Sequence, residues 1–395
     1  MSARTIVVAG AGLGGLTAAL ALAARGFRVA LFDKAEALAE TGAGIQLSPN
    51  ATRVLTGLGL RDRLLPSVVA PEAVVIRTAR NAAIARLPLG ATAETRYGAP
   101  YWIIHRGDLQ AALLAAVRER DGIALTLGAA VEAVAAKPDG VTVQVLRGTR
   151  RADTAAAALI GADGLWSRVR ALAGGTDSAR FARRTAWRAL VPAAAVAPDA
   201  RAHEVNLWLG PGSHLVHYPV KGGAMINIVA IAADTRPSTG WSTAAGPEEV
   251  MARFPADRWA KPARELLDRP THWLKWPLYD RPPLAPWGNG RMTLLGDAAH
   301  PMLPFLAQGA AMAIEDAAVL AAALAATPDD PTAGLRRYEA ARIPRTRRLQ
   351  RAARRSDRAY HLGPPASTLR DLAMRMMGDE RLLRHYDWIY GWRAE

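Results

Sequence analysis

Residues 5–33 constrain the fold of this 395-residue chain more than any other stretch. A short apolar run at 5–9 has the composition of a buried parallel strand. Three glycines in the spacing G-x-G-x-x-G follow it, and an Ala/Leu-rich segment at 16–25 favours a helix. A second β-type run at 27–32 ends at an acidic residue. Together these features predict a dinucleotide-binding strand–helix–strand unit.

Each part of this unit has a physical role. Gly10 permits the tight turn out of the strand, Gly12 lets the backbone approach a pyrophosphate, and Gly15 allows the helix to pack closely on the strand. The helix N-terminus presents free N–H groups and a positive dipole end to phosphates. Asp33 can accept hydrogen bonds from a ribose diol. The nucleotide-binding residues predicted here are Gly10, Gly12, Leu13, Gly14, Gly15, Asp33 and Lys34.

A formal net charge of +15 raises the question of nucleic-acid binding. Only five of the 50 basic residues are lysines, and the chain is strongly Ala-rich. We therefore interpret the charge as a bias of the overall amino-acid composition and not as a binding surface. The densest cluster, 336–358, holds ten arginines, which we read as a solvated helix face or a subunit contact. No nucleic-acid partner is predicted. The positive charge is expected only to attract small anionic substrates.

Cysteine is absent, which excludes disulfides, Cys-ligated zinc, iron–sulfur clusters and thiol nucleophiles. Redox chemistry would therefore need a bound organic cofactor. The histidines show no metal-ligand spacing on a helix, so no metal site is predicted. Because the longest apolar runs are broken by Arg, Asp or Gly, we expect no membrane span. A strand that starts almost at once leaves no room for a signal peptide, so a cytoplasmic protein is expected.

Strand and helix signals alternate along the first half of the chain. We expect strands at 74–87 (with a turn at Asn81), 101–105, 123–127, 131–135, 141–146 and 155–160. A glycine-containing loop is expected at 41–50, then a helix at 51–58 capped by Asn50, and a further helix at 108–118. From 183 to 276, alternating apolar and polar residues favour an antiparallel sheet with one helix at 247–253. Helices are expected at 308–326 and from 332 onward, interrupted at Pro344 and 363–365.

Three separated motifs carry a family resemblance. They are Gly10-x-Gly12-x-x-Gly15, Ala162-Asp163-Gly164 and Gly296-Asp297-Ala-Ala-His300-Pro301. In this order and spacing the chain resembles the class A FAD-dependent aromatic hydroxylases, and within them the salicylate, 3-hydroxybenzoate and 6-hydroxynicotinate hydroxylase branch. The resemblance covers essentially the whole length, including the ending at 386–391.

The resemblance implies an α/β fold. A Rossmann-like FAD-binding domain of the p-hydroxybenzoate hydroxylase type is interrupted by a smaller α+β substrate domain with an antiparallel sheet, and C-terminal helices follow. The expected FAD-binding segments are 1–72, 105–182 and 285–335. The expected substrate-domain segments are 73–104 and 183–284, and the helical region is 336–395.

The resemblance also assigns cofactor contacts. Asp297 would bond ribityl or diphosphate groups, Arg106 would reach the phosphates or ribityl chain, and the helix opening at Gly309 would face the flavin N1–C2=O edge. The further FAD-binding residues implied are Gly44, Arg106, Asp163, Gly164, Gly296, Asp297, Gly309, Ala310 and Ala311. Since no second G-x-G-x-x-G follows a strand, NADH or NADPH would be a transient co-substrate without a domain of its own.

The predicted catalytic pair is His214 and Tyr218, positions at which relatives carry His and Tyr. On a strand these two residues share a face, while His217 points to the opposite face and is read as structural. A base near a phenol helps to form the electron-rich phenolate. His300 is interpreted as shaping the loop over the flavin. The predicted substrate-binding residues are Gln46, Arg188, Pro304 and Phe305, of which Pro304 and Phe305 replace polar ligands of relatives with an apolar wall.

The implied function is a single-component, NAD(P)H-consuming monooxygenase that uses O2 to hydroxylate a small aromatic or heteroaromatic hydroxy-acid through a flavin C4a-hydroperoxide. One alternative is a flavin-dependent halogenase, although 187–192 lacks the second Trp of the Trp-x-Trp-x-Ile-Pro signature. Another is a non-catalytic, flavin-sensing protein that binds nucleic acid or a partner through 336–358. The substrate, the ring position, decarboxylation, the nicotinamide and the oligomeric state stay open, with a homodimer as one candidate.

Overall fold

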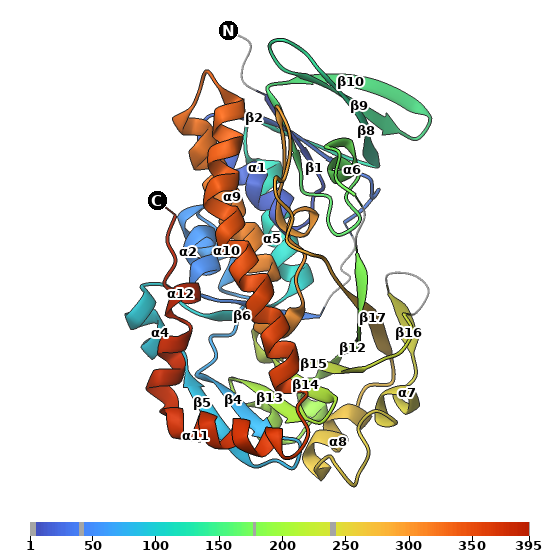
Figure 1. Ribbon diagram of the computed structural model, residues 1–395, viewed down its shortest axis with the longest axis vertical. Coiled ribbons are helices and arrows are strands. Elements are labelled where there is room, and N and C mark those ends of the chain that lie inside the picture. Colours follow the sequence, from blue (N-terminus) through green and yellow to red (C-terminus); the bar gives the residue numbers. More distant parts are fainter. Residues whose placement is uncertain (1–4, 39–42, 177–178, 238–241, 395) are drawn as a thin grey trace.

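The fold is built around a parallel sheet that begins with the first strand of the chain. A computed structural model describes residues 5–38, 43–176, 179–237 and 242–394. Five parallel strands form this sheet in the order β18-β11-β1-β2-β7. Figure 1 labels β1 and β2 among them. Their bounds are Met292–Leu294, Ala158–Gly161, Thr5–Ala9, Arg28–Asp33 and Ile123–Leu127. The expected strand–helix–strand unit is therefore confirmed, with α1 spanning Leu13–Ala23.

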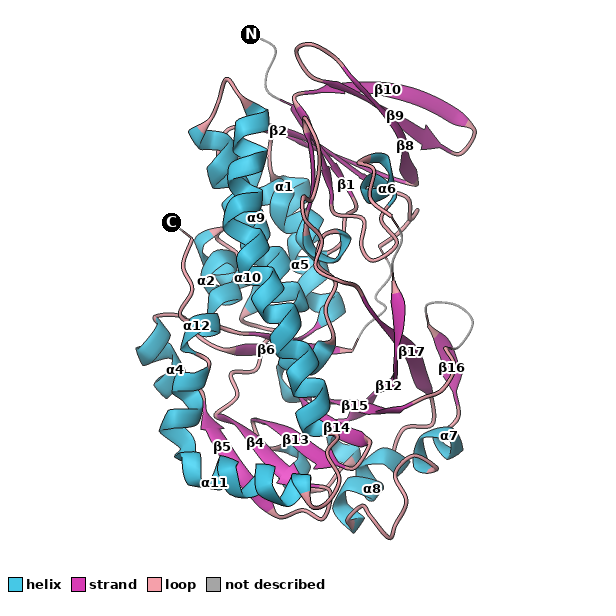
Figure 2. Ribbon diagram, viewed as in Figure 1, coloured by secondary structure: helices cyan, strands magenta, loops and turns pink. Residues whose placement is uncertain are grey.

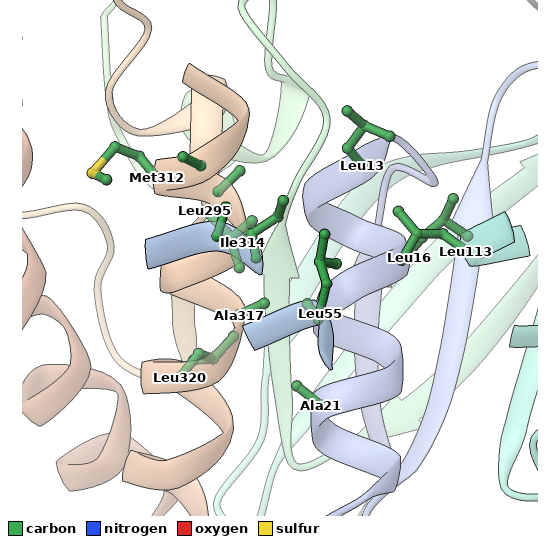
Figure 3. Packing of buried hydrophobic residues seen from close by; sticks show 14 of the residues in the cluster. Leu13, Leu16, Ala21, Leu55, Leu113, Leu295, Met312, Ile314, Ala317 and Leu320 are labelled. Carbon is green, nitrogen blue, oxygen red and sulfur yellow. The ribbon is translucent and has the colours of Figure 1, made fainter. Parts of the chain in front are cut away.

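Apolar helices bury one side of the parallel sheet. Helix α1 packs against α9 (Gly309–Ala326), and Figure 3 shows Leu16 of α1 and Ile314 of α9 in this core. The two helices approach closely because residue 14 is a glycine: a Cβ there would lie 3.1 Å from the Ala313 Cβ of α9. Helix α2 (Pro49–Gly57) and helix α5 (Arg106–Glu119) complete the layer. This packing places the N-terminal ends of α1 and α9 on the same side of the sheet.

A second, eight-stranded sheet lies below the parallel sheet in Figure 2. Its order is β16-β17-β12-β15-β14-β13-β4-β5, and every neighbouring pair is antiparallel except β13 with β4. The bounds in that order are Thr243–Ala245, Trp273–Asp280, Arg180–Pro192, Met225–Ala233, Ser213–Val220, Glu204–Gly210, Ala73–Thr78 and Ala83–Pro88. The expected antiparallel sheet is confirmed, and Asn81 forms the expected turn with φ +71°.

Several local predictions were wrong. The strand expected at 155–160 is two strands, because β10 (Arg150–Ala156) joins β8 (Ala129–Ala136) and β9 (Val141–Arg147) in a separate sheet while β11 enters the parallel sheet. The middle of the loop expected at 41–50 holds strand β3 (Gly44–Leu47), which pairs with β6 (Trp102–His105). Residues 41 and 42 lie outside the described residues. Helix α2 begins at Pro49 with Ser48 at its N-cap, so Asn50 is inside the helix.

The helices expected in the rest of the chain also differ in detail. Helix α7 (Pro247–Met251) lies at the expected place, but α8 (Lys261–Asp268) was not predicted. Helix α10 (Pro331–Tyr360) continues through Pro344 instead of stopping there. Its buried face holds it in the core, and the Thr346 hydroxyl bonds the Arg342 carbonyl one turn back. The remaining elements are α3 (Arg61–Leu64), α4 (Gly90–Tyr97), α6 (Arg168–Leu172), α11 (Ala366–His385) and α12 (Asp387–Tyr390).

Helix α9 corrects the expectation that no apolar run is long enough to cross a membrane. Among the described helices it alone has the necessary length and mean hydropathy, and 61% of it is buried inside the protein. It also carries Glu315 and Asp316, which are fully buried and ion-paired to Arg342 of α10. These contacts are those of a core helix in a folded domain.

Candidate active site

A cavity of about 340 Å³ lies where the two large sheets face each other. One wall is formed by the glycine turn and the start of α9, and the other by strands of the eight-stranded sheet. Most of the predicted site residues meet here. Those that line the cavity are Gly12, Leu13, Gly14, Gly44, Gln46, Arg106, Gly164, Arg188, His214, Tyr218, Gly296, Asp297, Pro304, Gly309 and Ala310.

The glycine turn has the geometry that a pyrophosphate requires. Gly10 has φ +104°, and a Cβ there would lie 2.4 Å from the Ala162 carbonyl oxygen. A Cβ on Gly15 would lie 1.8 Å from the carbonyl oxygen of Gly10, so the helix could not approach the strand. A Cβ on Gly12 would meet no protein atom within 4 Å, because this glycine faces the cavity. The turn thus leaves space for a ligand at the N-terminus of α1.

The two acidic residues nearest the turn are engaged with the backbone. Asp33 accepts hydrogen bonds from the N–H groups of Ala11 at 2.6 Å and Ala35 at 2.8 Å, while the neighbouring Lys34 is exposed. Asp163 accepts bonds from the Ser167 hydroxyl at 2.5 Å and from two N–H groups at the start of α6. Asp163 therefore braces a helix start rather than lining the cavity, and its role toward FAD stays a prediction.

The start of α9 and the strand–turn at 294–298 form the next part of the wall. Gly309 and Ala310 line the cavity, whereas Ala311 is buried in the core behind them. Asp297 is exposed to the cavity, and desolvation by the surrounding protein raises its pKa, opposed by the charges of His300 and Arg106. Arg106, the first residue of α5, projects an exposed side chain at the cavity edge. These residues fit a bound dinucleotide with a helix dipole at one end.

His300 is held away from the cavity by a buried ion network. Its Nε2 lies 2.5 Å from Asp316, and the same carboxylate accepts the Gly296 N–H at 3.0 Å and Arg342 Nε at 2.6 Å. Although burial alone would raise the pKa of Asp316, the charges of His300 and Arg342 lower it to about 2. Glu315 completes the network. His300 therefore fixes the turn at 296–301 to α9 and α10, in keeping with its expected role.

Strand β14 supplies the opposite wall. His214 and Tyr218 point into the cavity, and His217 faces the other side of the sheet, as its alternation predicted. His217 Nδ1 accepts the Trp208 indole N–H at 3.3 Å in a separate hollow. Burial, followed by the neighbouring His361 and by Arg184, holds the pKa of His214 well below its ordinary value. His214 is therefore neutral near pH 7 and can accept a proton.

Tyr218 is positioned by the strand expected as a loop. A Cβ on Gly44 would lie 2.4 Å from the Tyr218 ring, so only glycine lets the tyrosine pack there. Gly44 is itself fixed by its N–H bond to the Asn227 side chain at 2.6 Å. Burial raises the pKa of Tyr218, so its hydroxyl is a donor at neutral pH. Gln46 next to it accepts a bond from Tyr101 at 2.7 Å, a residue that sequence analysis did not select.

Arg188 on β12 is the cation of this wall. Its guanidinium stacks 5.1 Å from the ring centre of Trp276, and its Nε has no hydrogen-bond partner. The ion pairs found among the described residues do not include Arg188. Burial lowers its pKa. A buried donor without a partner is costly, so this group is available to an anionic ligand.

Three parts of the chain named in the sequence analysis do not line the main cavity. Phe305 does not line the main cavity; it is buried behind it, with its ring 5.5 Å from His214, and borders an adjoining hollow of about 90 Å³. Trp187, the residue of the halogenase comparison, lies buried in the core on the far face of the sheet. The arginine cluster at 336–358 is partly internal, since Arg342, Arg345 and Arg354 pair with carboxylates.

Comparison with known proteins identifies the family of this chain. The model of a family described as FAD binding domain matches residues 3–353. The 3-amino-4-hydroxybenzoate 2-monooxygenase of Streptomyces cremeus is 42% identical over 98% of this chain and 94% of its own length. The chain belongs to the FAD-dependent aromatic hydroxylases. The 3-hydroxybenzoate 6-hydroxylase of Klebsiella oxytoca is 36% identical over 99% of this chain and 97% of its own.

Solved structures agree with this family. A salicylate hydroxylase in complex with its substrate has a TM-score of 0.83 and 26% identity over 100% of this chain and 96% of that one. Klebsiella pneumoniae HpxO with FAD and uric acid has a TM-score of 0.84 and 26% identity over 97% and 95%. The fold class, the FAD cofactor and the monooxygenase class expected from sequence are thereby confirmed for this hydroxylase.

Proposed function

We propose that this hydroxylase acts on a small aromatic ring that carries a hydroxyl group and a carboxylate, such as a hydroxybenzoate or an aminohydroxybenzoate. One observation carries the proposal. The guanidinium of Arg188, whose Nε has no partner, and the neutral imidazole of His214 face the same cavity from β12 and β14, the two strands on either side of β15 in one sheet. A cation for the carboxylate and a base for the hydroxyl are the two groups that such a ring needs.

Each wall residue has a defined task in this proposal. Arg188 binds the carboxylate with its planar fork. His214 takes the hydroxyl proton and leaves an electron-rich phenolate. Tyr218 and Gln46 offer polar contacts beside the ring, and Pro304 makes the wall apolar and limits water. A carboxylate next to the hydroxyl would allow decarboxylation to accompany hydroxylation.

The opposite wall would hold the FAD. Gly12 and the N-terminus of α1 would bind the pyrophosphate through backbone N–H groups, Asp33 would bind the ribose, and Gly309 with Ala310 would bind the flavin end. FAD, once reduced by NADH or NADPH, supplies the activated oxygen for the ring. The chain around it orients the substrate and excludes water. We also propose the division into FAD-binding segments (1–72, 105–182, 285–335), substrate segments (73–104, 183–284) and a helical region (336–395), together with a cytoplasmic location and no nucleic-acid partner.

A substrate screen with two variants tests the proposal. Purified holoenzyme is mixed with NADH and, separately, with 3-hydroxybenzoate, salicylate, 3-amino-4-hydroxybenzoate or 6-hydroxynicotinate. We expect at least one acid to give NADH oxidation coupled to hydroxylated product rather than to peroxide. His214→Ala should keep FAD and lose coupled hydroxylation, while His217→Ala, on the far face, should retain it. Wild-type coupling in His214→Ala would refute the assignment of the base.

A further inference from the structure

His214 is joined to a second histidine that lies outside the cavity. Its Nδ1 is 2.8 Å from Nε2 of His361, a residue 147 positions later in the chain. His361 follows the last residue of α10, and Figure 1 shows that this long helix ends beside β14. The His361 carbonyl accepts the Gly212 N–H at 3.1 Å, which ties it to the start of that strand. This pair is therefore held by both backbone and side chains.

The hydrogen bonds determine which nitrogen of each ring carries a proton. Nδ1 of His361 lies 2.7 Å from the Asp357 carbonyl oxygen and 3.0 Å from the Asp357 carboxylate, and both of these groups only accept. Nδ1 of His361 must therefore be protonated. In the neutral ring, Nε2 of His361 is then an acceptor, so Nδ1 of His214 donates to it. The remaining nitrogen of His214, Nε2, is an unprotonated acceptor.

The carboxylate at the end of this chain is kept ionised. Arg184 Nε donates to Asp357 at 2.9 Å. Burial alone would raise the pKa of Asp357, but its bonds from His361 and Arg184 outweigh that effect and lower the pKa. Exposure also rises along the chain, since the side chains of His361 and Asp357 are 3% and 19% accessible. The series of hydrogen bonds from His214 through His361 to Asp357 thus runs from a buried ring toward solvent.

The aromatic neighbours restrain His214 without offering another proton acceptor. Phe305 and Tyr360 pack against its ring with centroids 5.5 and 5.6 Å away. The Tyr360 hydroxyl donates to the Phe305 carbonyl at 3.0 Å, so α10 also fixes the turn that carries Phe305. The charged or titratable groups that act on His214 are His361, Arg184 and, through His361, Asp357.

We propose that His361 and Asp357 form a proton relay that sets the tautomer of His214 and carries the substrate's hydroxyl proton out of the cavity. This proposal rests on His214 acting as the base in the proposed function. The substrate O–H bond breaks and its proton joins Nε2 of His214. The Nδ1 proton of His214 passes to Nε2 of His361, whose positive charge then lies beside Asp357. The Nδ1 proton of His361 leaves through Asp357 to water, so both rings then carry their proton on Nε2. The relay returns to its first state when a proton moves back along the same path to the phenolate oxygen of the product. His361 and Asp357 are positioning residues in this scheme.

The tautomer can be measured without any substrate. Holoenzyme labelled with 15N in its histidine rings is compared with His361→Ala, His361→Gln and His214→Ala by NMR correlation of ring nitrogens and carbon-bound protons. We expect wild-type His214 to be protonated at Nδ1, and the glutamine oxygen of His361→Gln to preserve this state. His361→Ala should change it. A wild-type His214 protonated at Nε2 would overturn the proposal, whatever the enzyme's substrate.

Proton transfer is measured on the same variants with 3-hydroxybenzoate and 3-amino-4-hydroxybenzoate. Proton release on binding is followed by stopped flow with a pH indicator, and FAD content is checked by absorbance. His361→Gln keeps the tautomer but cannot pass a proton, so release at pH 7 should slow at least tenfold. Asp357→Asn removes the stabilising charge and should move the pH midpoint of substrate ionisation upward by about one unit.

The outcomes separate the relay from the proposed function. If His214→Ala still couples hydroxylation, the proposed base is wrong, and the relay fails with it. If His214→Ala loses coupling while His361→Gln and Asp357→Asn release protons with wild-type rates and midpoints, the proposed function stands and the relay is refuted. Wild-type FAD content in each variant shows that a change in proton release does not come from loss of the cofactor.

Discussion

Replacing Arg188 with methionine should weaken substrate binding and strengthen the fold. The guanidinium stacks on Trp276 at 5.1 Å, and its Nε lacks a partner. Methionine keeps an apolar contact with the indole and removes the charge. A buried donor without a partner costs about 1–3 kcal/mol, and partial access through the cavity places Arg188 at the low end. In the absence of substrate we therefore expect Arg188→Met to be more stable by about 1 kcal/mol.

The effect on binding has the opposite sign. A hydrogen bond to a charged group contributes about 1.5–3 kcal/mol, and each 1.4 kcal/mol is about tenfold, so the dissociation constant should rise about 10- to 100-fold. At a substrate concentration of about 100 times the wild-type dissociation constant, binding stabilises the wild type by about 2.7 kcal/mol. A variant that binds about 30-fold more weakly gains only about 0.9 kcal/mol.

Both effects are measured by urea unfolding of the holoenzyme, followed by tryptophan fluorescence, with and without 3-hydroxybenzoate. Arg77→Met is the matched control, because Arg77 also lies on a strand and stacks on a tryptophan, 5.7 Å from Trp208, but lines a different cavity. It should leave substrate binding unchanged. If Arg188→Met binds the acid as tightly as the wild type, or is less stable without it, the assignment of Arg188 to the carboxylate is refuted.

Three further predictions concern the cofactor turn, the buried ion network and pH. Gly12→Ala should leave the melting temperature of the apoprotein unchanged and weaken FAD binding. Gly15→Ala places a Cβ 1.8 Å from a carbonyl oxygen and should instead lower the melting temperature of the apoprotein. Equal effects of the two variants on melting temperature and FAD binding would contradict the pyrophosphate assignment. Arg342→Met removes one partner from each of two buried carboxylates of α9, which keep Arg345 and His300 as ionic partners, and should cost about 3–5 kcal/mol in urea unfolding. Exposed Arg337→Met should cost less than about 0.5 kcal/mol. Burial, followed by the charge of Arg77, lowers the pKa of His217 to about 3 in the folded protein. His217 in the unfolded chain has an ordinary pKa of about 6.5, so the unfolded state binds the proton at a higher pH than the folded state does. Stability therefore falls as the pH drops below about 6.5. At pH 5 the loss from this group is about 2 kcal/mol, and His217→Gln should remove it; an unchanged pH dependence in that variant would show that His217 is not buried in the neutral form.

The features predictable from sequence are those with a local cause. The glycine spacing at Gly10 and Gly15 matches steric contacts that the structure shows within the same strand–helix unit. The alternation of His214, His217 and Tyr218 about β14 follows from strand geometry alone. The alternation at 183–276 and the helical pattern from 332 onward also indicated the second sheet and the C-terminal helices. Family resemblance supplied the way in which the two domains interrupt each other along the chain.

The features that sequence analysis missed depend on distant packing. Pro344 is accommodated because the helix on both sides of it is held in the core, which outweighs one lost backbone bond. Gly44 belongs to a strand only because β6 lies beside it. Arg188 was predicted to bind substrate, but the lack of a hydrogen-bond partner for its Nε is visible only when all its neighbours are in place. His361 has no sequence signal that links it to His214.

The contact between Gly44 and Tyr218 joins two parts of the chain that serve different ligands. Gly44 comes from the segment that borders the cofactor wall, and Tyr218 from the sheet that receives the ring. In such a sheet, side chains on one face can be substituted while the backbone hydrogen bonds between neighbouring strands are kept. The enzyme could therefore accept a new aromatic acid after few substitutions on β12, β14 and β15, provided that residue 44 remains glycine. Evolution of this enzyme toward other rings would be concentrated on one surface and leave the nucleotide turn unchanged.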